Sequence, residues 1–204
     1  MIKVEHLQVS TPKGAILQGV SFCTSEHLAI LGSSGSGKST LCKAICGILP
    51  PHFKLNYTKL ETDARAGYVF QDCISCFFPY LKIKDTFKMV LKDKLEKALT
   101  IFERLSVPTK VWQLYPYELS RGMASRVQIA LNLALEVQIL LLDEVTSSLD
   151  SANTNSVIEL LLGLDAQRVV ITHDEEVAFK LCQEVLVLES GQMAYFGSKK
   201  EYFG

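Results

Sequence analysis

The first third of the chain carries apolar runs of strand length, separated by polar turns. Residues 2–9 and 16–22 have the pattern of two strands on either side of the turn Thr11-Pro12-Lys13-Gly14, which predicts an antiparallel β edge. The apolar run 27–31 predicts another strand. It stops at a loop rich in Gly and Ser, and residues 39–49 beyond that loop have helical composition.

The rest of the chain alternates between helical and strand patterns. A strand at 66–70 is followed by a stretch from 83 to about 105 whose apolar residues recur every three or four positions, as expected of a helical insertion. The pattern then predicts a helix at 121–135, a buried strand at 137–142, a helix at 151–162, a strand at 168–172, a helix at 175–182 and a hairpin at 185–196. Strands alternating with helices favour a largely parallel sheet covered on both faces.

Composition restricts the class of protein. With 204 residues, of which 48% are hydrophobic, the chain can bury the core of one compact domain. Lys and Arg total 21 against 22 Asp and Glu, so no broad basic surface for nucleic acid is expected. No apolar run approaches the roughly 20 residues needed to cross a bilayer. The start of the chain does not resemble an export signal, so we expect the chain in the cytosol, with its six cysteines reduced.

The loop after residue 31 matches the phosphate-binding spacing G-x-x-x-x-G-K-[ST], between a predicted strand and a predicted helix. Its glycines let backbone N–H groups turn toward phosphate oxygens, Lys38 reaches the terminal phosphates, and the Ser39 hydroxyl is a ligand for Mg²⁺. The flanking elements favour this function over a flexible Gly/Ser turn that matches by chance. The predicted binding residues are Gly32, Ser33, Ser34, Gly35, Ser36, Gly37, Lys38, Ser39 and Thr40.

Two carboxylates follow the buried strand 137–142. The carboxyl ends of parallel strands are where α/β sheets hold their ligands. Asp143 therefore predicts a Mg²⁺ ligand, and Glu144 a general base that polarises the water attacking a phosphate. Acidic residues also end strands at solvated edges, and the phosphate loop decides between these interpretations.

The order of the remaining motifs carries a resemblance to a known family. Leu119-Ser120-Arg121-Gly122-Met123, here called the signature segment, stands between the two motifs, and Asp150 and His173 follow them. Over essentially its whole length the chain resembles the nucleotide-binding domains of ABC transporters. That resemblance implies an α/β P-loop NTPase core with a mostly parallel sheet, an antiparallel β edge and a helical subdomain. Residues 1–204 would form a single ABC ATPase domain, with the core at about 1–71 and 136–204 and the subdomain at about 72–135.

The resemblance also implies roles for single residues. Two such domains would pair head to tail around two ATP molecules and Mg²⁺, each ATP held by one P-loop and by Ser120, Arg121 and Gly122 of the other subunit. Gln71 would sense Mg²⁺ and the attacking water, His173 would contact the γ-phosphate, and Asp150 would bridge the dimer. Taken alone, Gln71 is equally a polar strand cap and His173 a hydrogen-bonded loop histidine.

Three features depart from the family's pattern, and a pair of cysteines also stands out. The turn at residues 11–14 lacks the aromatic residue that usually stacks on adenine, and Val145 stands where proline is common. Arg121 replaces a glycine and either touches the partner's nucleotide or loop, or turns to water. Cys73 and Cys76 have the spacing of a metal or redox pair, but no second pair completes a zinc site, which favours core cysteines.

The signature segment with its flanks, at residues 115–130, resembles in particular the ATPases of oligopeptide, dipeptide and nickel importers. The resemblance implies an ATP-hydrolysing subunit of an ABC membrane transporter. Its substrate would be peptides, nickel or metal chelates. We expect it at the cytoplasmic face of the membrane as a peripheral subunit. Its partners would be a second ABC ATPase subunit, identical or different, transmembrane permease subunits and an extracytoplasmic substrate-binding protein, with no nucleic acid. The alternatives are a non-transport ABC ATPase and a poorly hydrolysing partner in a heterodimeric transporter.

Overall fold

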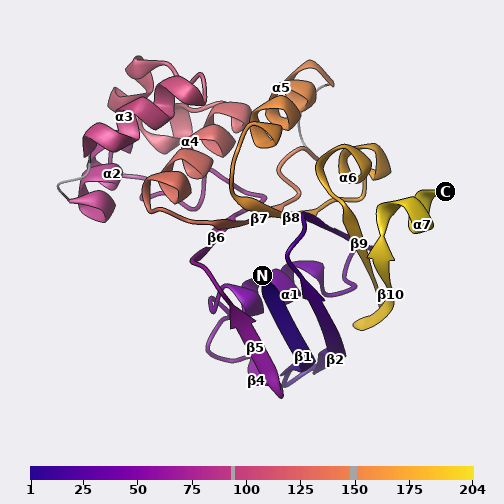
Figure 1. Cartoon of the computed structure of the whole chain (residues 1–204). Helices are drawn as coiled ribbons and strands as arrows, with labels where there is room; N and C mark the ends of the chain where they lie inside the picture. The colour runs from indigo at the N-terminus through magenta and orange to yellow at the C-terminus, as the bar shows by residue number, and fades with distance from the viewer. Residues whose placement is uncertain (93–94, 148–150) are drawn as a thin grey trace. The chain divides into compact units, whose positions relative to one another are not determined.

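The computed structural model describes residues 1–92, 95–147 and 151–204, and these fall into two compact units (Figure 1). Unit 1 comprises Met1–Tyr68, Gln138–Glu144 and Asp165–Gly204. Unit 2 comprises Val69–Val137 and Val145–Leu164.

An antiparallel sheet in unit 1 begins the chain. It contains β1 (Ile2–Thr11), β2 (Gly14–Thr24), β4 (Lys54–Asn56) and β5 (Lys59–Thr62), and β1 pairs with the other three. The buried positions of β1 change from even (Ile2, Val4) to odd (Leu7, Val9). The change falls at a register shift, where His6 has φ +52° and its N–H donates to Ser21 Oγ at 2.8 Å. This β-bulge keeps both pairs of apolar side chains on the core face.

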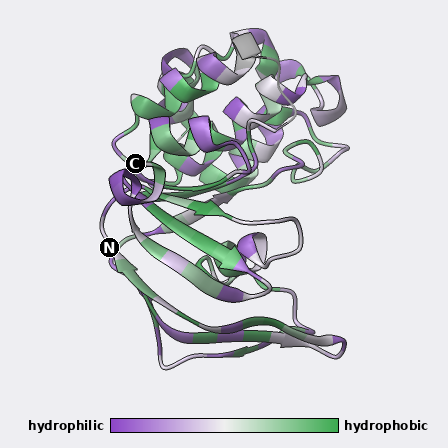
Figure 2. Cartoon of the chain, turned by 90° about the vertical axis from the view of Figure 1, so that its right-hand side faces the viewer, coloured by the Kyte–Doolittle hydropathy of each residue, from purple (hydrophilic) through white to green (hydrophobic). Residues whose placement is uncertain are grey.

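A six-stranded sheet forms the centre of the fold. Its order is β10-β9-β3-β8-β7-β6, with β3, β7, β8 and β9 parallel and β10 antiparallel to β9 at one edge. Every residue of β3 and β7 is buried, as expected of parallel strands covered on both faces. Figure 2 shows green along strands in the middle of the view and mixed colours on the helices and on the lower strands. The strands are β3 (Leu28–Leu31), β6 (Ala66–Val69), β7 (Ile139–Asp143), β8 (Gln167–Ile171), β9 (Glu184–Glu189) and β10 (Gln192–Ser198). The predicted α/β fold class is confirmed.

The helices of unit 1 are α1 (Lys38–Ile45), α6 (Glu175–Leu181) and α7 (Lys199–Phe203). Helix α1 is shorter than the predicted 39–49. It stops because Gly47, at φ +68°, donates its N–H to Ala44 O while the Ile48 N–H reaches Lys43 O. This pair of bonds is a Schellman cap, which ends a helix at a left-handed glycine.

Unit 2 contains α2 (Ile83–Leu91), α3 (Leu95–Arg104), α4 (Arg121–Ala134), α5 (Ser151–Leu162) and the short 3₁₀ helices η1 (Thr109–Gln113) and η2 (Pro116–Glu118). The predicted helical stretch 83–105 is two helices, since α2 ends where Lys92 has φ +53°. Their buried faces meet through Phe87, Phe102 and Trp112. The Phe102 and Trp112 rings stack at 4.6 Å between centroids, and Phe87 meets both edge-on. These three rings form the aromatic core of unit 2.

Within the described ranges, no helix combines the length and apolar character needed to cross a membrane.

Candidate functional site

The phosphate-type loop of unit 1 connects the buried end of β3 to α1. Gly32 has φ +140°, and a Cβ there would lie 2.2 Å from Leu188 O of the neighbouring strand β9. Gly37 has φ +103° and precedes α1 without a side-chain cap. Glycine at both positions lets the loop fold tightly and leaves the first N–H groups of α1 facing the loop.

Lys38 spans this loop from the first turn of α1. Its Nζ donates to Gly32 O and Ser33 O, both at 2.8 Å, and the side chain is largely buried. Both partners are neutral carbonyl oxygens. Ser36 Oγ, in the same loop, is one of the buried polar atoms in the described chain that lack a hydrogen-bond partner. A buried ammonium group with neutral partners, in a loop that also holds an unpartnered hydroxyl, fits an anionic group such as a polyphosphate.

Asp143, the last residue of β7, accepts hydrogen bonds from two other elements of unit 1. Ser39 of α1 donates its hydroxyl to Asp143 Oδ1 at 3.1 Å. The Tyr68 hydroxyl of β6 donates to Asp143 Oδ2. Burial, together with this bond, raises the pKa of Tyr68, so the phenol stays protonated and acts as the donor. The adjoining oxygens of Ser39 and Asp143 are of the type that Mg²⁺ prefers.

Glu144 begins the turn after β7 in a left-handed conformation, with φ +47°. Its N–H donates to Ile171 O at 3.1 Å, which ties the turn to the end of β8. His173 follows β8 closely, and its Nδ1 lies 4.0 Å from Glu144 Oε1. The Glu144 side chain is 24% exposed and that of His173 is 67% exposed, so both can reach a ligand at this edge of the sheet.

The signature segment lies in unit 2. Ser120 is the N-cap of α4, and its Oγ accepts the Met123 N–H at 3.2 Å. Because this bond uses the oxygen, the hydroxyl proton of Ser120 is still available for a donor contact. Gly122 lies in the first turn. The described start of α4 thus presents a hydroxyl and the positive end of a 14-residue helix.

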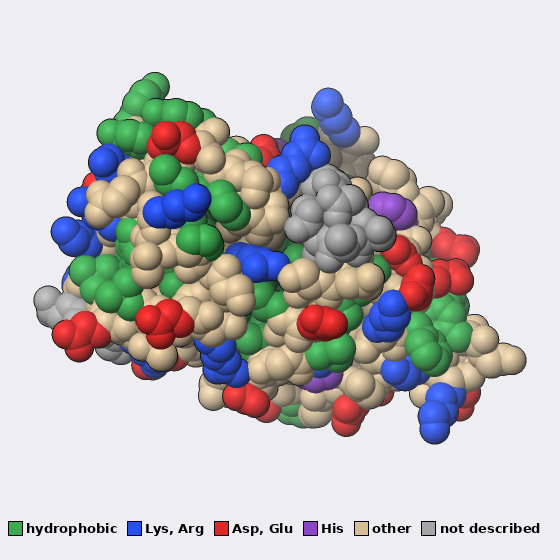
Figure 3. All heavy atoms as spheres, turned by 90° about the horizontal axis from the view of Figure 1, so that it is seen from above, with side chains coloured by type: hydrophobic (Ala, Val, Ile, Leu, Met, Phe, Trp, Pro, Cys, Tyr) green, Lys and Arg blue, Asp and Glu red, His purple; other side chains and the backbone are tan. Residues whose placement is uncertain are grey.

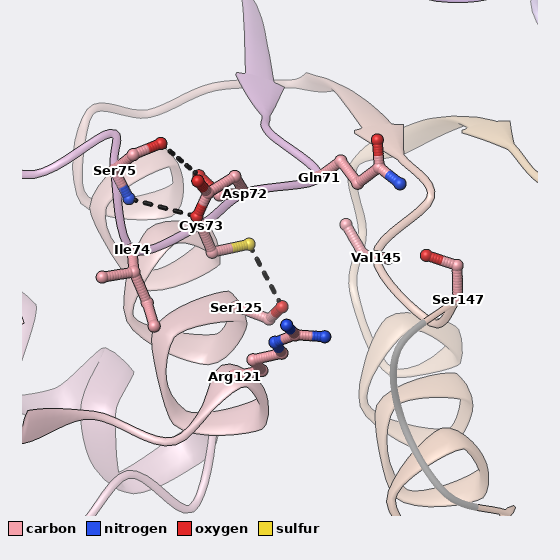
Figure 4. A pocket seen from close by; sticks show the side chains of 9 residues that line it. All are labelled: Gln71, Asp72, Cys73, Ile74, Ser75, Arg121, Ser125, Val145 and Ser147. Atoms are coloured by element: carbon pink, nitrogen blue, oxygen red, sulfur yellow. Dashed lines mark hydrogen bonds between the residues drawn. The ribbon is translucent and has the colours of Figure 1, made fainter. Parts of the chain in front are cut away.

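Arg121 lines a pocket of about 510 Å³ that belongs wholly to unit 2 (Figure 4). Its guanidinium points from the start of α4 into the space beside the turn that carries Val145 and Ser147. Hydrogen bonds from Ser75 lower the pKa of Asp72 on the opposite wall, and the charge of Arg121 contributes less. The other lining residues are Gln71, Cys73, Ile74 and Ser125.

The two cysteines with metal or redox spacing have local partners. Cys73 Sγ donates to Phe70 O at 2.8 Å and lies 3.2 Å from Ser125 Oγ. Cys76 Sγ donates to Cys73 O at 2.9 Å. Burial raises the pKa of both thiols, that of Cys76 to about 12. Protonated thiols are poor metal ligands and nucleophiles at neutral pH.

The structure therefore brings the P-loop, Asp143, Glu144 and His173 together in unit 1. Gln71, Ser120, Arg121 and Gly122 all lie in unit 2. Asp150 falls outside the described residues. Sequence reasoning missed Tyr68, because no motif marks it and only the place of β6 in the sheet brings it to Asp143.

Comparisons with known proteins agree with these motifs. A family model described as "ABC transporter" matches residues 17–147. The metal-staphylopine import system ATP-binding protein CntF of Staphylococcus aureus is 33% identical over 87% of this chain and 80% of its own length. The dipeptide transport ATP-binding protein DppD of Bacillus subtilis is 30% identical over 100% of this chain and 72% of its own. A dimeric ATP-binding cassette solved in a post-hydrolysis state, bound to ADP and Pi, superposes with a TM-score of 0.80 at 25% identity, covering 97% of this chain and 98% of that one.

Proposed function

Because the chain belongs to the ABC transporter family as one of its ATP-binding ATPase subunits, we propose that it powers an importer of peptides, nickel or metal chelates. The observation that carries the ATPase part of this proposal is the gathering of the phosphate loop, the Ser39–Asp143 oxygen pair and a Glu–His pair in one unit. Those are the groups that ATP hydrolysis needs.

Each group has a separate task in binding. Lys38 would exchange its two carbonyl partners for oxygens of the terminal phosphates, which are stronger acceptors because they are charged. Ser39 and Asp143 would hold Mg²⁺, directly or through its water. When bound, the cation neutralises charge on the phosphates.

Glu144 would orient and polarise the attacking water as a general base. The hydrogen bond to Ile171 O fixes the Glu144 backbone, so the position of the carboxylate does not depend on side-chain packing alone. His173, near Glu144, would contact the γ-phosphate. Gln71, at the edge of the unit 2 pocket, would sense the cation and the water.

A second subunit would complete the site. Ser120 and Gly122, at the exposed start of α4, would meet the nucleotide held by the P-loop of the partner, and Asp150 would bridge the two subunits. The dimeric relative bound to ADP and Pi supports this arrangement. The partner is another copy of this chain or a related ABC subunit.

Permease subunits would bind to exposed hydrophobic residues of unit 2. Of the aromatic residues before α2, Phe77 is core, whereas Phe78 is 54% and Tyr80 90% exposed. Figure 3 shows hydrophobic side chains exposed among Lys and Arg side chains over the α2 and α3 region. Docking on a permease would place the chain at the cytoplasmic face of the membrane. The names of the two relatives, one from a metal-staphylopine import system and one from dipeptide transport, support metal chelates or peptides as cargo. An extracytoplasmic binding protein would deliver that cargo.

The start of α4 also favours one variant of this function. Arg121 would weaken the nucleotide site that it completes on a neighbour if no phosphate compensates for the cation at a helix N-terminus. In a heterodimer, that asymmetry would leave one site hydrolysing poorly.

Light scattering of the Glu144→Gln chain with ATP or ADP tests the proposal. We expect ATP, and not ADP, to double the mass of the particle, alone or with the related subunit from neighbouring genes. The proposal is wrong if no nucleotide drives association and the unmodified chain hydrolyses ATP fully as a monomer.

A further inference from the structure

We propose that Tyr68 is a positioning residue for the cation: its hydroxyl fixes the Asp143 carboxylate so that Oδ1, beside Ser39, faces Mg²⁺. This inference rests on the proposed function, because it takes Ser39 and Asp143 as the cation site. It adds a residue that belongs to none of the motifs discussed above.

The geometry gives each carboxylate oxygen of Asp143 a different donor. Tyr68 OH donates to Oδ2 and Ser39 OH to Oδ1. The donors come from two different elements: β6, which lies beside β7 in the sheet, and the helix α1. A carboxylate held at both oxygens cannot rotate about its last bond without breaking one of them.

Burial makes this restraint difficult to replace. Tyr68 and Asp143 are each 6% exposed, so water has little access to the Oδ2 side. Without the phenol, Oδ2 would be a buried charged oxygen that lacks this partner, and the carboxylate would turn to find another. Such a turn carries Oδ1 away from the Ser39 hydroxyl.

Mg²⁺ is sensitive to this kind of change. The cation demands near-octahedral geometry at short distances, so it responds to the direction of each ligand oxygen. Loss of a residue that orients a metal ligand typically lowers metal affinity by about 10–100-fold. Tyr68 orients the metal ligand Asp143 in this way, since its hydroxyl contacts Oδ2 while that of Ser39 contacts Oδ1.

Tyr68→Phe isolates the hydroxyl. The ring remains, and with it the packing in the sheet and the position of Lys43, whose Nζ lies 6.0 Å from the ring centroid. Tyr195→Phe is a matched control, because it removes a tyrosine hydroxyl that donates to Ser198 O at 3.1 Å in β10.

The experiment titrates the whole chain with a fluorescent ATP analogue, once with Mg²⁺ and once with EDTA, and then titrates Mn²⁺ at saturating nucleotide by electron paramagnetic resonance. We expect Tyr68→Phe to weaken Mn²⁺ binding about tenfold and to lower nucleotide affinity only when Mg²⁺ is present. Tyr195→Phe should match the unmodified chain in every titration.

The inference is overturned if Tyr68→Phe binds Mn²⁺ as the unmodified chain does. An equal loss of nucleotide binding in Mg²⁺ and in EDTA also overturns it, because the hydroxyl would then support the fold and not the cation. Asp143→Asn separates this failure from failure of the proposed function. If Asp143→Asn loses cation binding and Tyr68→Phe does not, only the role of Tyr68 is wrong. If Asp143→Asn binds Mn²⁺ normally, the assigned cation site itself is wrong.

Discussion

Several candidate site residues of unit 1 differ in burial and in partners from those at the start of α4 in unit 2. In unit 1, Lys38, Ser39, Tyr68 and Asp143 are bonded to neighbours within the unit, and most of them are buried. In unit 2, Ser120 and Arg121 are exposed at the start of α4, and Arg121 faces an open pocket. These four residues of unit 1 are thus held in place by hydrogen bonds within the unit, whereas Ser120 and Arg121 of unit 2 are open to solvent.

Glu144→Gln, in unit 1, should have the largest effect of the changes proposed, and the affected property should be the rate of ATP hydrolysis. Replacing the carboxylate removes the proposed general base, so ATP hydrolysis should fall by about 10²–10⁴-fold while nucleotide binding persists. Phosphate release and nucleotide titration measure the two properties. Glu176→Gln, on the exposed face of α6, is the control and should leave the rate unchanged. A normal rate in Glu144→Gln would assign the base elsewhere.

Phe102→Ala should break the core of unit 2. The ring is fully buried between Phe87 and Trp112, so its removal should lower the free energy of unfolding by about 3–5 kcal/mol. Urea denaturation followed by circular dichroism measures the loss. Phe179→Ala, at a ring that is 49% exposed, should cost much less. Equal losses at both positions would mean that the three rings are not the core of the unit.

Arg121→Gly tests whether the exposed start of α4 contacts the partner subunit. A contact between Arg121 and the partner's nucleotide or loop should appear as a change of about two- to fivefold in the partner-dependent ATPase rate, the size expected for a charge at a helix end. Arg121→Lys keeps the charge and should show a smaller change. An unchanged rate in Arg121→Gly would mean that the side chain turns to water.

The smallest expected effect is a pH dependence of stability in unit 1. Burial, with a smaller contribution from the charge of Arg168, lowers the pKa of His27, whose Nδ1 accepts the Arg168 backbone N–H at 3.1 Å. The unfolded chain therefore binds this proton more readily than the folded chain. Stability from this group is present above pH 6.5 and is lost as pH falls through the lower folded pKa.

Thermal unfolding at pH 7.5 and 5.0 measures that loss. His27→Gln, which does not titrate, should show a smaller decrease in Tm between the two pH values. An identical decrease in both proteins would place the sensitive group elsewhere.

Sequence patterns predicted the central strands and the motif positions well and the element ends less well. The buried runs of β3 and β7 are unambiguous, and Gly32, Asp143 and Glu144 stand at their ends as expected. The predicted end of α1 at residue 49 was wrong, because the cap at Gly47 ends the helix before Pro50. Strands β4 and β5 were not predicted: β4 is exposed and β5 only half-buried, so neither has a buried apolar pattern.

The sequence by itself determined the family from the order of its motifs, the α/β fold class from the alternation of strand and helix patterns, and the phosphate loop from one local motif. Each of these patterns can be followed along the chain and has a direct physical meaning. The tertiary structure alone decided that Tyr68 contacts Asp143. These residues are 75 positions apart, and the contact exists only because β6 lies beside β7 in the sheet. Local spacing does not encode which distant strands become neighbours, since burial of the whole core selects that pairing.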